Sequence, residues 1–322
     1  MSGRWLAGKV AAALLTFVFV LIFNFFLFRV MGDPTNQLAK LPQSTPKEIK
    51  QLRHDYGLDK PLLGQFVVYA KDTATFDLGT SQRSRRPVWD EIAEAIPWTL
   101  LLVGTGTVIA TLLGSWLGVI AATRRGKRAD DGLLGFSLFT YAAPEYWMGI
   151  ILILVFAVWI PVFPSGLQMT PGGEFSGFLG EAADVAEHLV LPATAMTLML
   201  LGQYFLIMRS SMVDVLTEDF ITVKRAIGLP WHRVVRRHAV PNAMLPLVTL
   251  SAIQFGAVAG GAITIETIFS WPGLGLLSYE AINARDFPVL QGTFLVFSAA
   301  VIVANLLADC LYFYLDPRVQ SR

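Results

Sequence analysis

The sequence has few charged residues, one cysteine and four histidines among its 322 residues. Charged side chains make up 15% of the chain, whereas 54% of the residues are hydrophobic and are gathered in long runs. This pattern excludes an ordinary water-soluble domain and is typical of a protein that crosses the membrane several times. The single cysteine, Cys310, excludes an internal disulfide, and we expect it to be a small buried side chain. A net charge of +1 gives no reason to expect a nucleic-acid partner.

Two motifs of catalytic proteins are also missing. No G-x-x-x-x-G-K-[ST] phosphate-binding loop occurs, so the chain itself is not expected to hydrolyse ATP. No H-E-x-x-H spacing occurs, and the histidines are scattered along the chain, which argues against a catalytic zinc site. We therefore expect no metal, no bound cofactor and no enzymatic activity in this chain. The histidines are His54, His188, His232 and His238.

Six hydrophobic runs are long enough to span a bilayer, which needs about 20 residues. We predict an all-α integral membrane protein with six transmembrane helices. The first run could belong to a signal peptide, but no small-x-small cleavage site follows it, so we interpret residues 1–31 as a retained first transmembrane helix. The runs cover residues 10–28, 98–123, 133–163, 189–208, 247–269 and 289–315.

Residues 32–97 differ in composition from the rest of the chain, because they combine turn residues with scattered aromatic and aliphatic side chains. We predict a small folded extracytoplasmic cap here, since an unstructured linker would carry fewer hydrophobic residues. Thr45 and Glu48 are spaced as a capping box for a short helix within it. Residues 98–322 then form a core of five transmembrane helices.

The positive charges decide the orientation of the spans. Residues 164–188 contain no Lys or Arg, and residues 270–288 contain only Arg285. By the positive-inside rule, the loop after the second span, the polar stretch 217–246 and both termini are therefore cytoplasmic. The deciding residues are Arg124, Arg125, Lys127, Arg128, Lys224, Arg225, Arg233, Arg236, Arg237, Arg318 and Arg322.

The stretch 217–246 is a charged island between two hydrophobic runs. Phe220, Val223 and Ile227 have the spacing of one helix face. Gly228 is suited to the left-handed residue that ends a helix, and Pro230 to the first turn of the next helix.

The second helix of the island should carry Trp231, Val234 and Val235 on one face. A helix, a tight turn and a second helix suit insertion into a groove of a soluble partner. A simple amphipathic loop on the membrane surface is the alternative.

Small residues and carboxylates mark the spans. The spacings Gly114-xxx-Gly118 and Gly256-xxx-Gly260 allow close helix packing, either within the chain or at an interface that moves. The carboxylates of Glu145, Glu266 and Asp309 lie in or near spans, where such groups are functional candidates. Because Pro272, Gly273 and Gly275 break the helix, we predict that residues 266–275 form a bent gate near the outer mouth.

Several motifs resemble one transporter family in the same order along nearly the whole chain. FITVKRAIGL and RHAVPNAMLP in the island are joined by RVMGDP, TPKEIKQLRHDYGLDKPLLGQF, DLGTS, PEYW, ETIFSWPGLG and the terminal DPR. The chain resembles the permease subunits of dipeptide/oligopeptide binding-protein-dependent ABC importers, and its long first loop resembles the "B" member of the permease pair. It departs from the pattern that names the "EAA" loop, because Thr222, Val223 and Lys224 stand in place of a glutamate and two alanines.

The resemblance implies the fold of a type I importer permease in a bacterial inner membrane. It also implies a second permease subunit, two ATPase subunits that hold ATP and magnesium, an extracytoplasmic solute-binding protein and a lipid surround. The coupling loop would be residues 210–246. The residues that would contact the ATPase are Lys224, Arg225, Ala226, Gly228, Leu229, Pro230, Trp231, Arg233, His238 and Pro241.

The substrate stays open at this level. Peptides are expected, while nickel chelates and oligosaccharides are alternatives within the same class. An ion-coupled secondary transporter is the rival class, but it should show inverted repeats and ionisable residues at the membrane midplane, and neither is evident.

Overall fold

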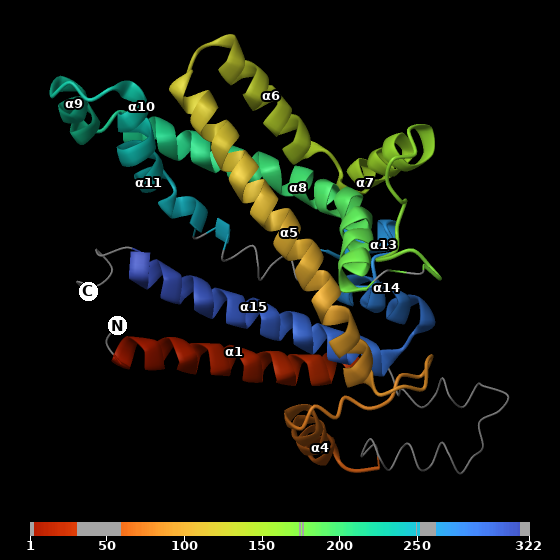
Figure 1. Ribbon diagram of the computed structural model, residues 1–322. Helices are drawn as coiled ribbons and strands as arrows, with labels where there is room; N and C mark the ends of the chain where they lie inside the picture. The colour runs from red at the N-terminus through yellow and green to blue at the C-terminus, as the bar shows by residue number, and fades with distance from the viewer. Residues whose placement is uncertain are drawn as a thin grey trace.

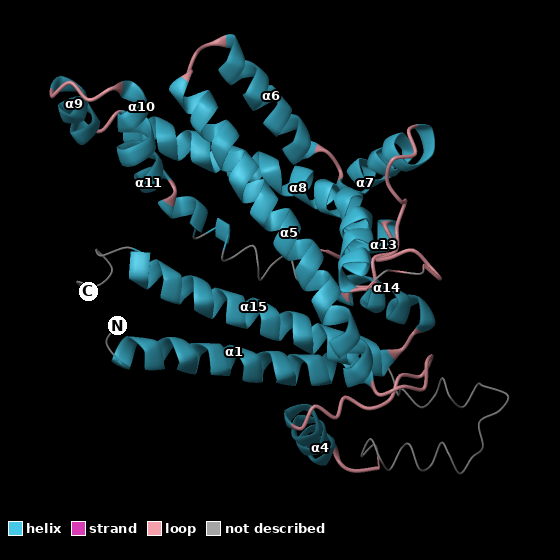
Figure 2. Ribbon diagram, in the orientation of Figure 1, coloured by secondary structure: helices cyan, strands magenta, loops and turns pink. Residues whose placement is uncertain are grey.

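The computed structural model describes residues 3–30, 59–173, 175, 177–248, 250–251 and 262–315. The regular elements of this part of the chain are helices (Figure 2), which agrees with the predicted all-α class. Their bounds are α1 Gly3–Val30, α4 Leu62–Ala74, α5 Val88–Thr123, α6 Arg128–Ala142, α7 Glu145–Ile153, the π-helix η1 Leu154–Trp159, α8 Phe178–Leu216, α9 Asp219–Ala226, α10 Trp231–Val234, the π-helix η2 Val235–Ala239, α11 Val240–Ala243, α13 Ile263–Ile268, α14 Leu274–Ala284 and α15 Phe287–Leu315.

Four of these helices are long and apolar enough to cross a membrane: α1, α5, α8 and α15. The predicted third span, residues 133–163, is not one straight helix. It consists of α6 and α7 with η1, which are bent by 101° at a short break. Pro144 lies at the break and has no N–H to continue the helix, so the chain turns there. The middle of the predicted fifth span, residues 252–261, and the Thr45–Glu48 capping box lie outside the described residues, so six spans remain a prediction.

Two of the long helices extend well past the predicted spans. Helix α5 begins at Val88, ten residues before the hydrophobic run that starts at Trp98. The prediction missed this first part of the helix, because its first turn carries Asp90 and Glu91 and is too polar for a membrane span. Acidic residues suit this position, since they face the positive end of the helix dipole. Helix α8 likewise begins at Phe178. The boundary predicted at residues 97 and 98 therefore falls inside a helix.

Helices α5 and α8 form the centre of the molecule and approach each other closely. A Cβ atom on Gly114 would lie 2.7 Å from Tyr204 Cβ, and one on Gly118 would lie 3.0 Å from the Phe205 carbonyl oxygen. The prediction that Gly114 and Gly118 allow close packing is confirmed, and the packing is within the chain. Gly256 and Gly260 are not among the residues that the structure describes.

Helices α1 and α15 lie side by side and run in opposite directions (Figure 1). Lys9 Nζ lies 2.8 Å from Asp309 Oδ2, so this carboxylate is paired within the helix pair. Near the other end, Asn24 Nδ2 donates to the Gln291 carbonyl at 3.2 Å. These contacts hold the first and last described helices together.

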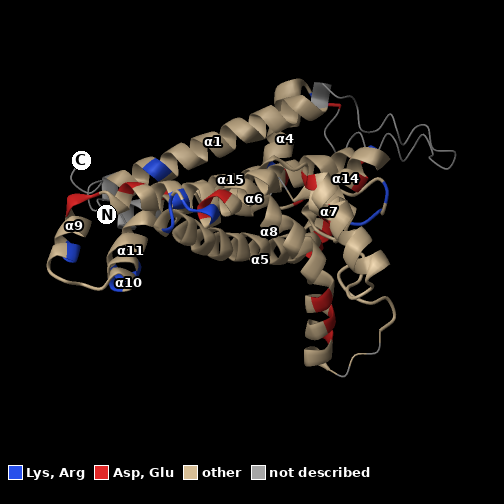
Figure 3. Cartoon of the chain, turned by 90° about the horizontal axis from the view of Figure 1, so that it is seen from above, with Lys and Arg blue, Asp and Glu red and all other residues tan. Residues whose placement is uncertain are grey.

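Different helices lie at the two ends of the molecule. Helices α9 to α11 lie at the same end as the start of α1 and the end of α15 (Figures 1 and 3). Helices α13 and α14 and the start of α5 lie at the opposite end. The polar island, the start of α1 and the end of α15 thus share one side of the helices, and the assignment of this side to the cytoplasm remains a prediction.

Candidate functional site

The bend of the polar island is a complete helix-ending motif. Gly228 has a φ of +83°, so the predicted left-handed conformation is confirmed. Its N–H donates to the Arg225 carbonyl at 3.0 Å, and the Leu229 N–H donates to the Lys224 carbonyl at 3.3 Å. This pair of bonds is the Schellman motif, in which the last helical carbonyls are satisfied by the two residues after the helix. Helix α9 therefore ends at a defined point and the chain turns sharply.

The apolar face of α9 is exposed. Phe220, Val223 and Ile227 are 38%, 57% and 66% exposed, whereas Ile221 is only 2% exposed and packs into the main core. Ile221 was missed in the sequence, because it does not share the spacing of the other three residues. It anchors the helix, and its three neighbours are left at the surface.

The second helix of the island starts after Pro230 and changes to a π-helix after one turn. Val234 and Val235 are buried, while Trp231 is 42% exposed, so the predicted common face of these three residues is only partly buried. Trp231 stands at the first residue of the helix, beyond the core, and the Arg225 guanidinium lies 5.3 Å from the centre of its ring. This contact ties the two helices of the island across the bend.

The predicted coupling residues are accessible at this end of the molecule. The exposed ones are Arg225, Ala226, Gly228, Pro230, Trp231, Arg233 and Pro241, and the half-buried ones are Lys224, Leu229 and His238.

At the opposite end, Glu266 braces the turn between α13 and α14. Its side chain is fully buried. Oε1 accepts a hydrogen bond from Thr99 Oγ1 at 2.7 Å, and Oε2 accepts from the backbone N–H groups of Gly275 and Leu276 at 2.7 and 3.1 Å. The Thr99 hydroxyl also accepts from the Leu274 N–H at 2.7 Å. A carboxylate with three donors in a buried site is a structural clamp that fixes this turn to α5.

Neither Gly273 nor Gly275 has room for a side chain in this turn. A Cβ atom on Gly273 would lie 2.4 Å from the Glu266 carboxylate, and one on Gly275 would lie 2.6 Å from the Ile263 Cα atom. Trp271 Nε1 donates to the Trp98 carbonyl at 2.9 Å and adds a second link to α5. Residues 266–275 are bent as the sequence predicts, and Glu266 lies inside the bend instead of facing an open path.

A cavity of about 570 Å³ adjoins this turn. Pro272 and Gly273 line it, together with residues of the loop 81–86, the start of α5 and helix α14. Glu145 is a separate feature: it lies half-buried in the first turn of α7, after the break at Pro144, and does not line this cavity. Among the described residues, no three His, Cys, Asp or Glu side chains are placed to hold a metal ion.

Comparison with known proteins gives consistent matches. Residues 114–321 match the family described as binding-protein-dependent transport system inner membrane component, and residues 3–103 match the N-terminal family of such membrane components. The chain is 35% identical to the dipeptide transport system permease protein DppB of Escherichia coli strain K12 over 336 residues, covering 99% of both chains. It is 35% identical to the di/tripeptide transport system permease protein DppB of Pseudomonas aeruginosa strain UCBPP-PA14, again with 99% coverage of both. It is 36% identical to the glutathione transport system permease protein GsiC of Escherichia coli O6:H1 over 308 residues, covering 95% of this chain and 94% of the relative.

Proposed function

The chain belongs to the family of binding-protein-dependent transport system inner membrane components, and on this premise we propose that it is a permease subunit of an ATP-driven importer of short peptides. The names of its relatives support the substrate, because they refer to dipeptides, di/tripeptides and glutathione, which is itself a short peptide. The complete transporter would add a second permease subunit, two ATPase subunits and an extracytoplasmic solute-binding protein. ATP and magnesium would be held by the ATPase subunits.

The observation that carries this proposal is the exposed face at the Gly228 bend. Phe220, Val223, Ile227 and Trp231 are apolar and exposed, and they flank a rigid turn at the end of the molecule that we assign to the cytoplasm. Apolar side chains gathered on a short helix outside the hydrocarbon core favour docking into a groove of a partner protein. In an importer whose membrane chain lacks a phosphate-binding loop, that partner is the ATPase.

ATP-driven closure of the ATPase subunits would displace the bend at Gly228, and the connections of α9 indicate how this movement would reach the membrane helices. Only Thr217 and Glu218 separate α9 from α8, and α8 packs closely against α5. A displacement of the bend at Gly228 would therefore be passed to α8 and α5, and coupling requires that nucleotide and loaded binding protein favour different positions of this packed pair. At the other end, the cap would receive the binding protein, and the turn with Pro272, Gly273 and Gly275 would act as the gate.

Two alternatives are separated by simple observations. An importer of the same class that carries nickel chelates or oligosaccharides would be identified by what the cognate binding protein retains in a binding assay. An ion-coupled secondary transporter would show proton-coupled uptake by this chain alone. Co-purification with an ATPase subunit favours the importer.

The coupling role is tested by replacing Gly228 with valine in the reconstituted transporter. No atom lies within 4 Å of a Cβ placed there, so the effect comes from the left-handed backbone, which a β-branched residue adopts only with strain of about 1–2 kcal/mol. We expect normal assembly but at least a several-fold loss of uptake and of ATP hydrolysis stimulated by the binding protein.

Gly228→Asn is the conservative variant, because asparagine tolerates this conformation, and it should retain most activity. Gly126→Val is the matched control: Gly126 has a φ of +76° in the loop between α5 and α6, with equally open surroundings. Equal losses in Gly228→Val and Gly126→Val, or normal coupling in Gly228→Val, would count against the proposal.

A further inference from the structure

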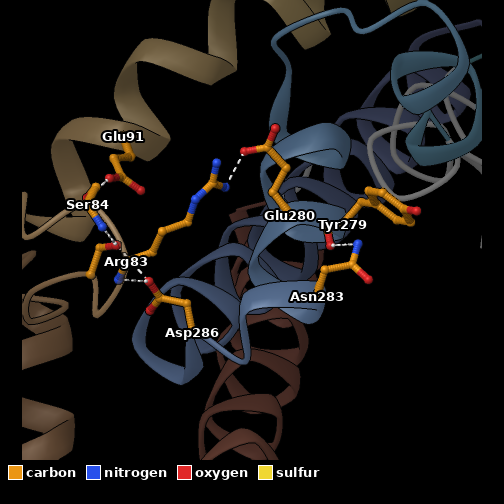
Figure 4. A network of polar contacts seen from close by, with 8 residues as sticks. Arg83, Ser84, Glu91, Tyr279, Glu280, Asn283 and Asp286 are labelled. Atoms are coloured by element: carbon orange, nitrogen blue, oxygen red, sulfur yellow. Dashed lines mark hydrogen bonds and ion pairs between the residues drawn. The ribbon is translucent and has the colours of Figure 1, made fainter. Parts of the chain in front are cut away.

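The loop 81–86 is held at the end opposite α9 by a continuous chain of hydrogen bonds (Figure 4). The Asp286 carboxylate, only 2% exposed, accepts from Ser81 Oγ at 2.6 Å and from the Arg83 N–H at 3.0 Å. Ser81 Oγ accepts from the Ser84 N–H at 3.1 Å, and the Ser84 hydroxyl donates to Glu91. This chain links the turn before α15 to the first turn of α5. The loop is therefore preorganised, which lowers the entropic cost of binding a ligand beside it.

The cavity beside this loop has walls of opposite chemical character. Trp98, Leu277 and Val289 supply apolar surface. Arg83 and Arg86 supply positive charge, and each is paired with a carboxylate from a different segment: Arg83 Nη1 lies 2.5 Å from Glu280 Oε2, and Arg86 Nη1 lies 3.0 Å from Glu94 Oε2. These side chains are exposed, so their pairs exchange partners readily in water.

Two carboxylates of the cavity, Asp286 and Glu91, have no Lys or Arg side chain of the described residues within hydrogen-bonding distance. The lining contains two arginines and four carboxylates, which gives a formal charge of 2 − 4 = −2. Glu280 and Glu94 are paired with arginines, and Asp286 is buried among its donors. Glu91 is half-buried, and its hydrogen bond in the described part of the chain comes from the neutral Ser84 hydroxyl. A cationic group in the cavity would find its acceptor there.

We propose that this cavity is a binding site for the transported peptide, in which the free α-ammonium group binds the Glu91 carboxylate and the terminal carboxylate binds Arg83 or Arg86. This assignment rests on the proposed function. The volume of about 570 Å³ lies within the ~300–1,000 Å³ that small-molecule sites occupy. Charges of both signs fit the two ends of a short peptide, the apolar wall fits its side chains, and the turn with Pro272 and Gly273 forms part of the lining. The peptide would therefore be held directly beside the gate.

The test compares Glu91→Gln with Asp90→Asn in the complete transporter reconstituted into liposomes. Asp90 shares the first turn of α5 with Glu91, is exposed and does not line the cavity, so Asp90→Asn removes the same kind of helix-end charge. The binding protein is loaded with labelled L-alanyl-L-alanine and used at saturation, and uptake and ATP hydrolysis are measured in the same vesicles. Size-exclusion chromatography confirms equal assembly.

We expect Glu91→Gln to lower the number of dipeptides imported per ATP hydrolysed by roughly 3- to 10-fold, the effect of losing one partly exposed charged hydrogen bond. Stimulated ATP hydrolysis should stay normal, and Asp90→Asn should match the wild type. Equal coupling ratios in both variants would overturn the proposal. A parallel fall of stimulated ATP hydrolysis and uptake in Glu91→Gln would also overturn it, because Glu91 would then contact the binding protein. If the wild-type complex shows no ATP-dependent uptake, the proposed function itself fails and this inference falls with it.

Discussion

From the close contact between α5 and α8 we predict that alanine substitutions at two glycines of α5 affect stability differently. A Cβ atom on Gly118 would lie 2.8 Å from Met208 Cβ and 3.0 Å from both the Arg209 nitrogen and the Phe205 carbonyl oxygen. Two of these three atoms belong to the backbone of α8, so they cannot move without displacing that helix. Gly104 lies on the same helix, and a Cβ atom placed on it would have no atom within 4 Å.

The two substitutions are expected to differ in free energy, because only Gly118→Ala has to displace neighbouring atoms. Alanine favours a helix interior over glycine by about 0.5–1 kcal/mol, and both substitutions share this gain. Gly118→Ala also overpacks the interface, which costs about 1–3 kcal/mol. Gly118→Ala is therefore neutral to destabilising by about 2 kcal/mol, whereas Gly104→Ala is stabilising by up to about 1 kcal/mol.

Thermal unfolding of the two variants in the same detergent measures this difference directly. The two substitutions add the same methyl group to the same helix, so effects on the unfolded chain and on detergent binding cancel in the comparison. Gly118→Ala should melt several degrees below Gly104→Ala. If Gly118→Ala melts at the same temperature or higher, close backbone approach is not what holds α5 against α8, and the account of the central helix pair is wrong.

Two further polar contacts yield predictions by the same measurement. Glu266→Gln replaces one of the two acceptor oxygens by an amide donor, so the hydrogen bonds from Thr99 and from the Gly275 and Leu276 N–H groups cannot all be kept; we expect the free energy of unfolding to fall by about 1–3 kcal/mol and the melting temperature to drop. An unchanged melting temperature would contradict the clamp. Asp130→Asn removes the negative charge and one of the two oxygens that accept from Arg209 at 2.7 and 2.8 Å, and it should lower the free energy of unfolding by about 1–3 kcal/mol, whereas Asp131→Asn, exposed and adjacent, should lower it by less than about 0.5 kcal/mol. Equal effects of the two asparagine substitutions would refute a role for the pair.

Local features of the fold could be predicted from the sequence because their causes are local. The left-handed turn at Gly228 needs only a glycine after a helical segment and a proline two residues later. The break before Glu145 needs only Pro144. The size of that bend, 101°, could not be predicted, since it depends on how α7 packs against the other helices.

Contacts between distant residues could not be predicted in the same way. Thr99 and Glu266 are 167 residues apart, and Ser81 and Asp286 are 205 residues apart. Glu266 was predicted to be a functional carboxylate because it lies in a hydrophobic run, but only the fold shows that three donors surround it. Glu91 did not attract attention in the sequence, because it lies in the stretch 32–97 that was predicted to be a cap and the helix that carries it was predicted to start only at Trp98.

The two proposed sites are joined by the α5–α8 pair. Helix α5 has 36 residues and therefore a length of about 54 Å, which exceeds the ~30 Å hydrocarbon core. Its first turn carries Glu91, and its Thr99 holds the Glu266 turn. Gly118 contacts α8, which leads into α9 and the bend at Gly228.

Because backbone atoms of α8 face the glycines of α5 directly, the two helices cannot slide past each other without changing these contacts. They should move as one body, so a displacement at the Gly228 bend tilts the first turn of α5 and the turn clamped by Glu266 together. The substitutions at Gly228 and Gly118 then interrupt the same path in different ways. Gly228→Val should disconnect the ATPase from a stable helix pair, whereas Gly118→Ala should weaken the pair itself and lower stability and coupling together.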